Sequence, residues 1–142
     1  MKKTTQELLE LMKNSRDYHA YLDENREEIT ATHMKIDRAL HVLLADSGKK
    51  KADVIAKSGI ENHYAYQIFS GHRIPTRDKV IMLCIGFSLT VEETLRLLKI
   101  TGYAPLYGKD ERDNVILFGI TKQLSMIDLN ELLFELGLDI LV

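Results

Sequence analysis

The sequence has little of what secreted, metal-stabilised or membrane-spanning proteins need. Its 142 residues include one cysteine, Cys84, which excludes an internal disulfide and a zinc site built on several cysteines. Because Cys84 lies in the apolar run 80–85, we expect a buried small hydrophobe and not a reactive thiol. No long uncharged apolar stretch is present, and the first residues lead into an amphipathic segment instead of a signal sequence. These features predict a cytoplasmic protein without a membrane partner.

Motifs for catalysis and cofactor binding are also lacking. There is no glycine-rich phosphate loop, no Gly-x-Ser-x-Gly elbow and no nucleophile paired with a base. The histidines between residues 33 and 72 do not share the spacing on one helix face that metal sites use. The sequence therefore predicts no enzyme activity, no metal and no cofactor.

The charge is small in total but unevenly distributed. The net charge is −2, which is unusual for a protein that binds nucleic acid. Residues 33–79 nevertheless carry nine basic and five acidic side chains, a net charge of +4, so the remainder carries −6. A basic centre between acidic flanks is typical of a binding module with partner or regulatory segments attached.

The pattern of apolar residues predicts an all-α fold in three parts, because no alternation typical of strands is present. Residues 1–30 are expected to form an N-terminal helical extension that begins with a capping box at Thr4 and Glu7. Residues 31–102 are expected to form a helix-turn-helix domain, with short helices at 50–58 and 62–70. Residues 103–142 are expected to form a C-terminal helical hairpin.

An internal repeat occurs at an offset of 35 residues. The segment 77–81, RDKVI, matches 112–116, RDNVI, and the register continues to Leu106 and Leu141. The match predicts that the hairpin at 77–106 occurs a second time and stacks on the first copy. Chance similarity between two leucine-rich helical pairs is the alternative. The charged residues at 110–113 are interpreted as a solvated turn and helix start.

The helical pair at residues 50–70 carries the functional prediction. Gly59 supplies a turn in which a residue without a side chain is favoured. Asn and Gln side chains pair with adenine and His can donate to guanine, so the outer face of the second helix can contact base edges. The residues expected to contact bases are Asn62, His63, Tyr64, Tyr66 and Gln67.

The segment 59–75, GIENHYAYQIFSGHRIP, resembles the turn, recognition helix and glycine-basic-basic-x-proline exit of the lambda-repressor-like (XRE) family of helix-turn-helix regulators. The resemblance covers roughly residues 36–98 and implies base contacts by Asn62, His63 and Gln67. It also implies phosphate contacts by Lys51 and Arg77.

The chain departs from the family pattern at three positions. The family usually has alanine at the position of Ile55 and a branched aliphatic residue at the position of Ala65. The two positions face each other across the turn, so the exchange conserves the total side-chain volume. Phe69 stands where the family has a glutamate, and we expect it to pack on the helix at 77–87.

Lysines stand where the first helix of the pair begins, although the partial positive charge of a helix N-terminus disfavours cations. A phosphate bound there would turn the repulsion into attraction. A solvated lysine run is the alternative. The side chains expected to contact phosphates are Lys49, Lys50, Lys51, Arg73, Arg77 and Lys79.

These features predict a sequence-specific transcriptional regulator that places the helix 62–70 in the major groove of double-stranded DNA, as a homodimer on an inverted repeat. The acidic flanks are the expected dimer or partner surfaces, with simple packing as the alternative. The leucines that suggest this lie at positions 129, 132, 133, 136 and 138.

Two other functions remain open from the sequence. The same fold serves as a protein-interaction module, antitoxin-like or scaffold, in which the acidic flanks bind a protein partner. A small-molecule sensor with a ligand between the repeats near Tyr103 and Tyr107 is the third interpretation, although convergent polar groups are not evident there.

Overall fold

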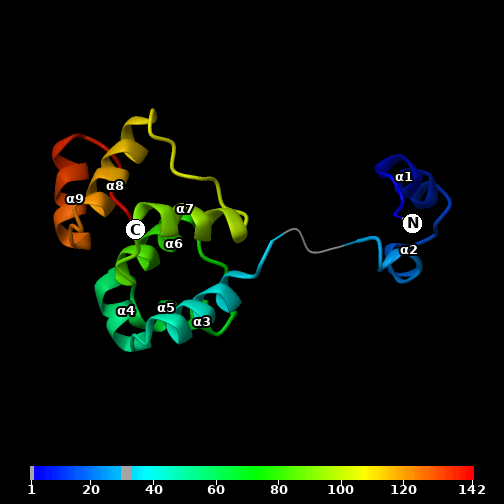
Figure 1. The fold of residues 1–142 in the computed structure, drawn as a ribbon, viewed down its shortest axis with the longest axis horizontal. Helices are drawn as coiled ribbons and strands as arrows, with labels where there is room; N and C mark the ends of the chain where they lie inside the picture. Colours follow the sequence, from blue (N-terminus) through cyan, green and yellow to red (C-terminus); the bar gives the residue numbers. More distant parts are fainter. Residues whose placement is uncertain (1, 30–32) are drawn as a thin grey trace. The chain divides into compact units, whose positions relative to one another are not determined.

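The structure is a computed structural model that describes residues 2–29 and 33–142, and these residues are all-helical, as predicted (Figure 1). Two compact units are present, one in each described range. Residues 30 and 31, between which the first domain boundary was predicted, lie outside the described residues. The helices are α1 (Thr5–Lys13), α2 (Tyr18–Asn25), α3 (Ile36–Ser47), α4 (Lys51–Ser58), α5 (Asn62–Phe69), α6 (Arg77–Gly86), α7 (Val91–Ile100), α8 (Glu111–Thr121) and α9 (Met126–Glu135).

The first unit is a hairpin of α1 and α2. The Thr4 hydroxyl accepts a hydrogen bond from the Glu7 N–H at the start of α1, which is one of the two hydrogen bonds of the predicted capping box. Tyr21 and Asn25 on α2 are buried, and the Lys3 ammonium donates to the side-chain oxygen of Asn25. This unit therefore has a small interior of its own.

The second unit is built around α6, whose apolar side chains are buried on nearly all sides. Helix α4 packs very closely on α6. A Cβ atom at Gly86 would lie only 2.5 Å from the carbonyl oxygen of Val54, so this position requires glycine. Helix α3 contacts α5, and Gly48 and Gly59 end α3 and α4 with φ angles of 67° and 75°. Glycine adopts this left-handed conformation without steric cost, so each helix stops at its glycine.

The two hairpins that share a sequence register also share their backbone geometry. Helices α7 and α9 begin and end at positions 35 residues apart. The residues before them, Ser88 and Gln123, have unusual positive φ angles of 58° and 56°. Gly102 and Gly137 follow the helices with φ angles of 83° and 73°. Because two non-glycine residues adopt the same strained conformation at equivalent positions, the hairpins are two copies of one structural unit.

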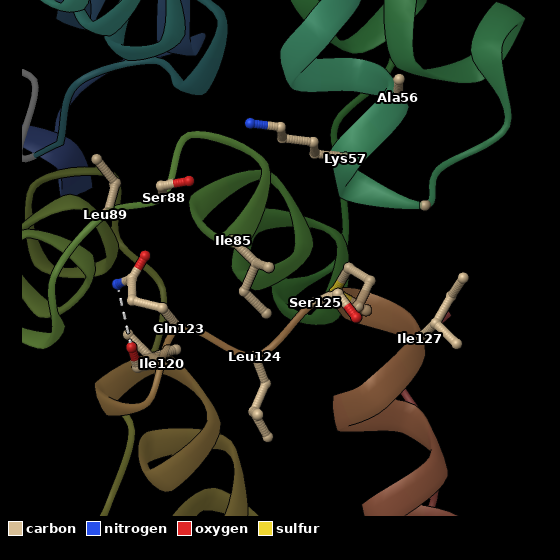
Figure 2. A pocket seen from close by; sticks show the side chains of 12 residues that line it. Ala56, Lys57, Ile85, Ser88, Leu89, Ile120, Gln123, Leu124, Ser125 and Ile127 are labelled. Atoms are coloured by element: carbon tan, nitrogen blue, oxygen red, sulfur yellow. Dashed lines mark hydrogen bonds between the residues drawn. The ribbon is translucent and has the colours of Figure 1, made fainter.

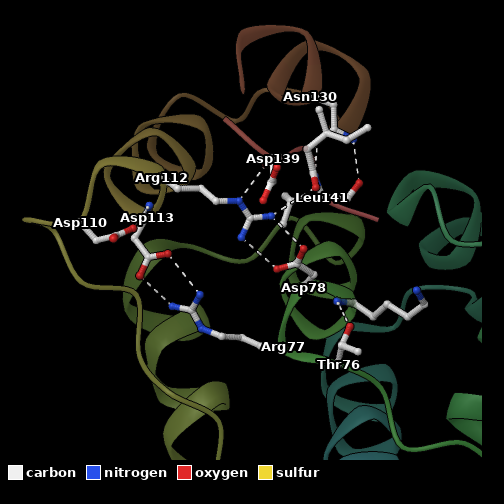
Figure 3. A network of polar contacts seen from close by, with 11 residues as sticks. Thr76, Arg77, Asp78, Asp110, Arg112, Asp113, Asn130, Asp139 and Leu141 are labelled. Atoms are coloured by element: carbon white, nitrogen blue, oxygen red, sulfur yellow. Dashed lines mark hydrogen bonds and ion pairs between the residues drawn. The ribbon is translucent and has the colours of Figure 1, made fainter. Parts of the chain in front are cut away.

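Reciprocal ion pairs connect the two copies (Figure 3). Arg77 donates to both carboxylate oxygens of Asp113 at 3.2 and 2.8 Å, and Arg112 donates to both of Asp78 at 3.1 and 2.8 Å. Each arginine also donates to two backbone carbonyls at the end of its own copy. Those carbonyls belong to residues 104 and 105 for Arg77 and to 139 and 140 for Arg112, again 35 positions apart. Arg77 and Arg112 thus close each hairpin and join it to its neighbour.

The interpretation of residues 110–113 as a solvated turn is wrong for Asp113, which is buried. Burial opposes ionisation of this carboxyl, but the Arg77 guanidinium and the Tyr107 N–H more than compensate and lower the pKa of Asp113. The hydrogen bonds that Arg112 donates to the Asp78 carboxylate raise the pKa of Arg112. Neither effect is visible in the sequence, where four consecutive charged residues indicate exposure.

The last residues of the chain are fastened to α9. The Asn130 side chain donates to the Leu141 carbonyl at 3.0 Å and accepts from the Leu141 N–H at 2.8 Å (Figure 3). Leu129 and Leu133 are buried in the same core as α6, so they are not free to form a dimer surface. Leu136, by contrast, is half exposed. None of the helices in the described ranges has the length and apolar character needed to cross a bilayer.

Candidate functional site

Helix α5 is held against the core by one face and presents the other outward. Glu61, which precedes the helix, accepts hydrogen bonds from the N–H groups of His63 and Tyr64 at 3.0 and 2.7 Å. These bonds lower the pKa of Glu61. The buried face consists of Ala65, Ile68 and Phe69. The position of the outer face is therefore determined by a capped start and a packed interior.

The outer face of α5 carries the predicted base-contacting residues. Asn62, His63 and Tyr66 are exposed, and Tyr64 and Gln67 are half-buried. The Gln67 side-chain oxygen accepts from Arg73 Nε at 3.2 Å, and the Nε2 group of the same amide is a further donor. The five residues thus lie together on α5, with donors and acceptors of the kind that base edges require.

Cations lie over aromatic rings along both edges of this helix. The Lys51 ammonium is 5.9 Å from the ring centre of Tyr66, and Arg73 and Lys79 are 5.7 and 5.1 Å from that of Tyr64. Side chains two positions apart on a helix point in roughly opposite directions, so Tyr64 and Tyr66 hold these cations on opposite sides of α5. Each such contact stabilises the cation by roughly 0.5–1 kcal/mol at an exposed site.

Two of the predicted phosphate contacts already have partners within the fold. The Lys49 ammonium donates to the Phe87 carbonyl, where α6 ends and negative partial charge accumulates. Arg77 is engaged with Asp113 and with two backbone carbonyls, as described above. The remaining members of the predicted set lie near α5 or at the start of α4. Lys51, Arg73 and Lys79 lie over aromatic rings of α5, and Lys50 precedes α4.

The start of α4 lacks the usual cap. Lys50 occupies the cap position and makes no side-chain hydrogen bond to the helix. Among the helices in the described ranges, only α3 shares this feature, whereas the others begin with an accepting Ser, Thr, Asp or Glu side chain. The first backbone N–H groups of α4 therefore have no acceptor from the cap side chain, and two lysines stand beside them.

Ile55, Ala65 and Phe69, which differ from the pattern of the lambda-repressor-like family, are all buried. Ile55 and Ala65 lie in the core of the helical pair. Phe69 packs near Phe87, at the end of α6, with ring centres 6.5 Å apart. His41 on α3 donates to the Phe69 carbonyl at 2.9 Å and ties this end of α5 to α3.

Two apolar hollows adjoin Gly59 and Met126. The first, of about 440 Å³, lies between α4 and the turn from α8 to α9, and Lys57 is the charged residue on its wall (Figure 2). The second, of about 580 Å³, lies between the start of α5 and the C-terminal residues. Sequence reasoning missed both hollows, because they form between segments more than 60 positions apart.

Tyr103 and Tyr107, between which a ligand was suggested, do not line one common hollow. Tyr103 donates from its hydroxyl to the Pro75 carbonyl at 2.6 Å and lines a hollow of about 530 Å³ with residues of α3 and the loop before α6. Tyr107 is exposed and does not line that hollow. In the described ranges, no three His, Cys, Asp or Glu side chains come together as a metal set.

Comparison of this chain with protein-family models finds no match, and comparisons with curated proteins and with solved structures find none either.

Proposed function

We propose that this protein is a sequence-specific DNA-binding regulator with a helix-turn-helix of the lambda-repressor-like kind, formed by α4, Gly59 and α5. The observation that carries the proposal is the outer face of α5, where polar groups suited to base edges lie between cations held over Tyr64 and Tyr66. Polar contacts to bases supply sequence information, and the cations supply affinity for the backbone.

The roles divide between two sets of side chains. Asn62, His63 and Gln67 contact bases, with Tyr64 and Tyr66 at the edges of the contact. Lys50, Lys51, Arg73 and Lys79 neutralise phosphates. We leave Lys49 and Arg77 out of the contact because their donors are used within the fold.

A phosphate at the start of α4 would also explain its unusual sequence. The N–H groups of an uncapped helix end attract an anion, and Lys50 and Lys51 add two positive charges. Without an anion the same lysines oppose the helix by roughly 0.3–1 kcal/mol each.

Selection of random DNA duplexes by the purified full chain at near-physiological salt tests the proposal. We expect enrichment of one sequence, and of an inverted repeat if two copies bind together. Fluorescence anisotropy should then show that Asn62→Ala or Gln67→Ala weakens binding to the selected duplex by about 1–3 kcal/mol, with little change on random DNA. Gln6→Ala, an exposed glutamine on α1, is the matched control.

The salt dependence tests the second set of residues separately. Lys50→Ala and Lys51→Ala should weaken binding to all sequences and lower the slope of log affinity against log salt by about 1 each. Lys99→Ala on α7 should leave the slope unchanged. Failure to enrich any sequence, with only weak binding that vanishes as salt rises, would overturn the regulator proposal in favour of a protein-interaction module.

A further inference from the structure

The outer surface of α9 is unusually apolar. Ile127 and Phe134 are 72% and 77% exposed and lie two helical turns apart on one face. Ile140 and Val142, in the C-terminal segment fastened to α9, are also exposed, and they line the second hollow together with Ile127. We refer to Ile127, Phe134, Ile140 and Val142 as the α9 ridge.

The first copy of the repeat has charged residues at the positions equivalent to Ile127 and Phe134, as is usual for a surface that contacts only water. Ile127 and Phe134 are equivalent to Glu92 and Lys99 on α7, and both of these are exposed. The same backbone therefore presents charged side chains in the first copy and large apolar ones in the second. Large apolar side chains exposed on one helix face in this way are typical of an interaction site.

The hollow next to the ridge can accept an anchoring side chain. Its volume is about 580 Å³, and its walls are largely apolar. Met82 and Met126 contribute flexible thioether side chains, which adapt to the shape of an inserted group. A pocket that admits one buried anchor is the usual centre of a protein–protein interface.

The charge around the ridge identifies the class of partner. Residues 124–142 contain four acidic residues and no lysine, arginine or histidine. A second copy docked through the same face would bring eight side-chain carboxylates together, and like charges that face one another disfavour an interface. An anionic membrane is disfavoured for the same reason. The acidic residues are Asp128, Glu131, Glu135 and Asp139, and all are exposed.

We infer that the α9 ridge binds a basic amphipathic helix of another protein. An apolar side chain of that helix would enter the second hollow, and its lysines or arginines would face the acidic residues of α9. Glu61 and Tyr64, at the start of α5, and Lys79 on α6 line the same hollow. The partner would therefore sit beside α5, with its basic residues directed toward the carboxylates of α9 and away from Lys79. The inference rests on α9 and the C-terminal segment and does not require the proposed function to be correct.

Selection from a displayed library of helical peptides, with the full chain as bait, tests this inference. The library keeps one apolar face and varies the flanking positions among basic, neutral and acidic residues. We expect enrichment of basic flanks, and binding of a labelled winner that weakens at least tenfold in the double variant Ile127→Glu with Phe134→Lys. These are the residues that the first copy carries at the equivalent positions, so the fold should tolerate them.

Two controls make the outcome specific. Lys99→Ser on α7 should leave peptide binding unchanged, and circular dichroism should show that the double variant melts like the parent. Glu131→Gln with Glu135→Gln should also weaken binding of the basic peptide, but less than the double variant of the ridge does.

Three results would overturn the inference: no enriched peptide, enrichment that ignores flank charge, or binding that survives the ridge variant. Concentration-dependent dimerisation in sedimentation experiments, lost in the ridge variant, would assign the face to a second copy instead. The peptide assay contains no DNA, so its failure is distinguishable from failure of the DNA selection.

Discussion

Asp113 connects the two copies of the repeat, and its replacement by alanine should destabilise the protein strongly. The Asp113 side chain is 10% exposed and accepts two hydrogen bonds from Arg77 and one from the Tyr107 N–H. Removing one partner of a buried pair costs about 3–5 kcal/mol, whereas exposed pairs contribute about 0–1 kcal/mol. Because Arg77 is 25% exposed and keeps two carbonyl partners, we expect a loss of about 2–3 kcal/mol in the free energy of unfolding.

Urea denaturation of the full chain, followed by circular dichroism, measures this loss. Asp78→Ala should cost less free energy of unfolding, because the Asp78 side chain is 26% exposed and that of Asp113 is 10% exposed. A double-mutant cycle of Arg77→Ala and Asp113→Ala should give a coupling of about 1–3 kcal/mol. Glu111→Gln, an exposed neighbour on α8, should stay within about 0.5 kcal/mol of the parent. A cost for Asp113→Ala no larger than that of this control would refute our account of the junction.

The same carboxyl predicts a dependence of stability on pH. The pKa of Asp113 is lowered in the folded protein, so its contribution is present above the ordinary aspartate pKa of about 3.9. The contribution is lost as the pH falls through the lower, folded value. Asp113→Asn should therefore flatten the decline of unfolding free energy below about pH 4. A decline as steep as that of the parent would show that Asp113 does not supply it.

Two further predictions concern the interior around α6. Gly86→Ala should lose about 2–3 kcal/mol of stability in urea, because the new Cβ atom meets the Val54 carbonyl oxygen and backbone cannot move aside. Gly108→Ala, where nothing lies within 4 Å, should be nearly neutral, and equal effects at both glycines would contradict the packing of α4 on α6. Burial raises the pKa of the Cys84 thiol to about 12, so a disulfide reagent should modify it only after unfolding. Rapid modification in native buffer would show that Cys84 is accessible.

The sequence by itself was sufficient for features that depend on local chemistry. The all-α class follows from the periodicity of the apolar residues. The ends of α3 and α4 follow from Gly48 and Gly59, because glycine adopts positive φ angles without the steric cost that other residues have. The outward position of Asn62, His63 and Tyr66 follows from the spacing of the buried residues on α5. The 35-residue repeat was visible in the sequence from the matching segments 77–81 and 112–116 and from Gly102 and Gly137.

Only the tertiary structure decided how charged and apolar side chains are used. Arg77 and Lys49 carry the charge that a phosphate contact needs, but the carbonyls and the carboxylate that engage them come from distant segments. Leu133 and Phe134 are adjacent and similarly apolar, yet one is buried in the core and the other is exposed. Periodicity shows that a helix has an apolar face, but which neighbour covers that face depends on contacts between segments far apart in the chain.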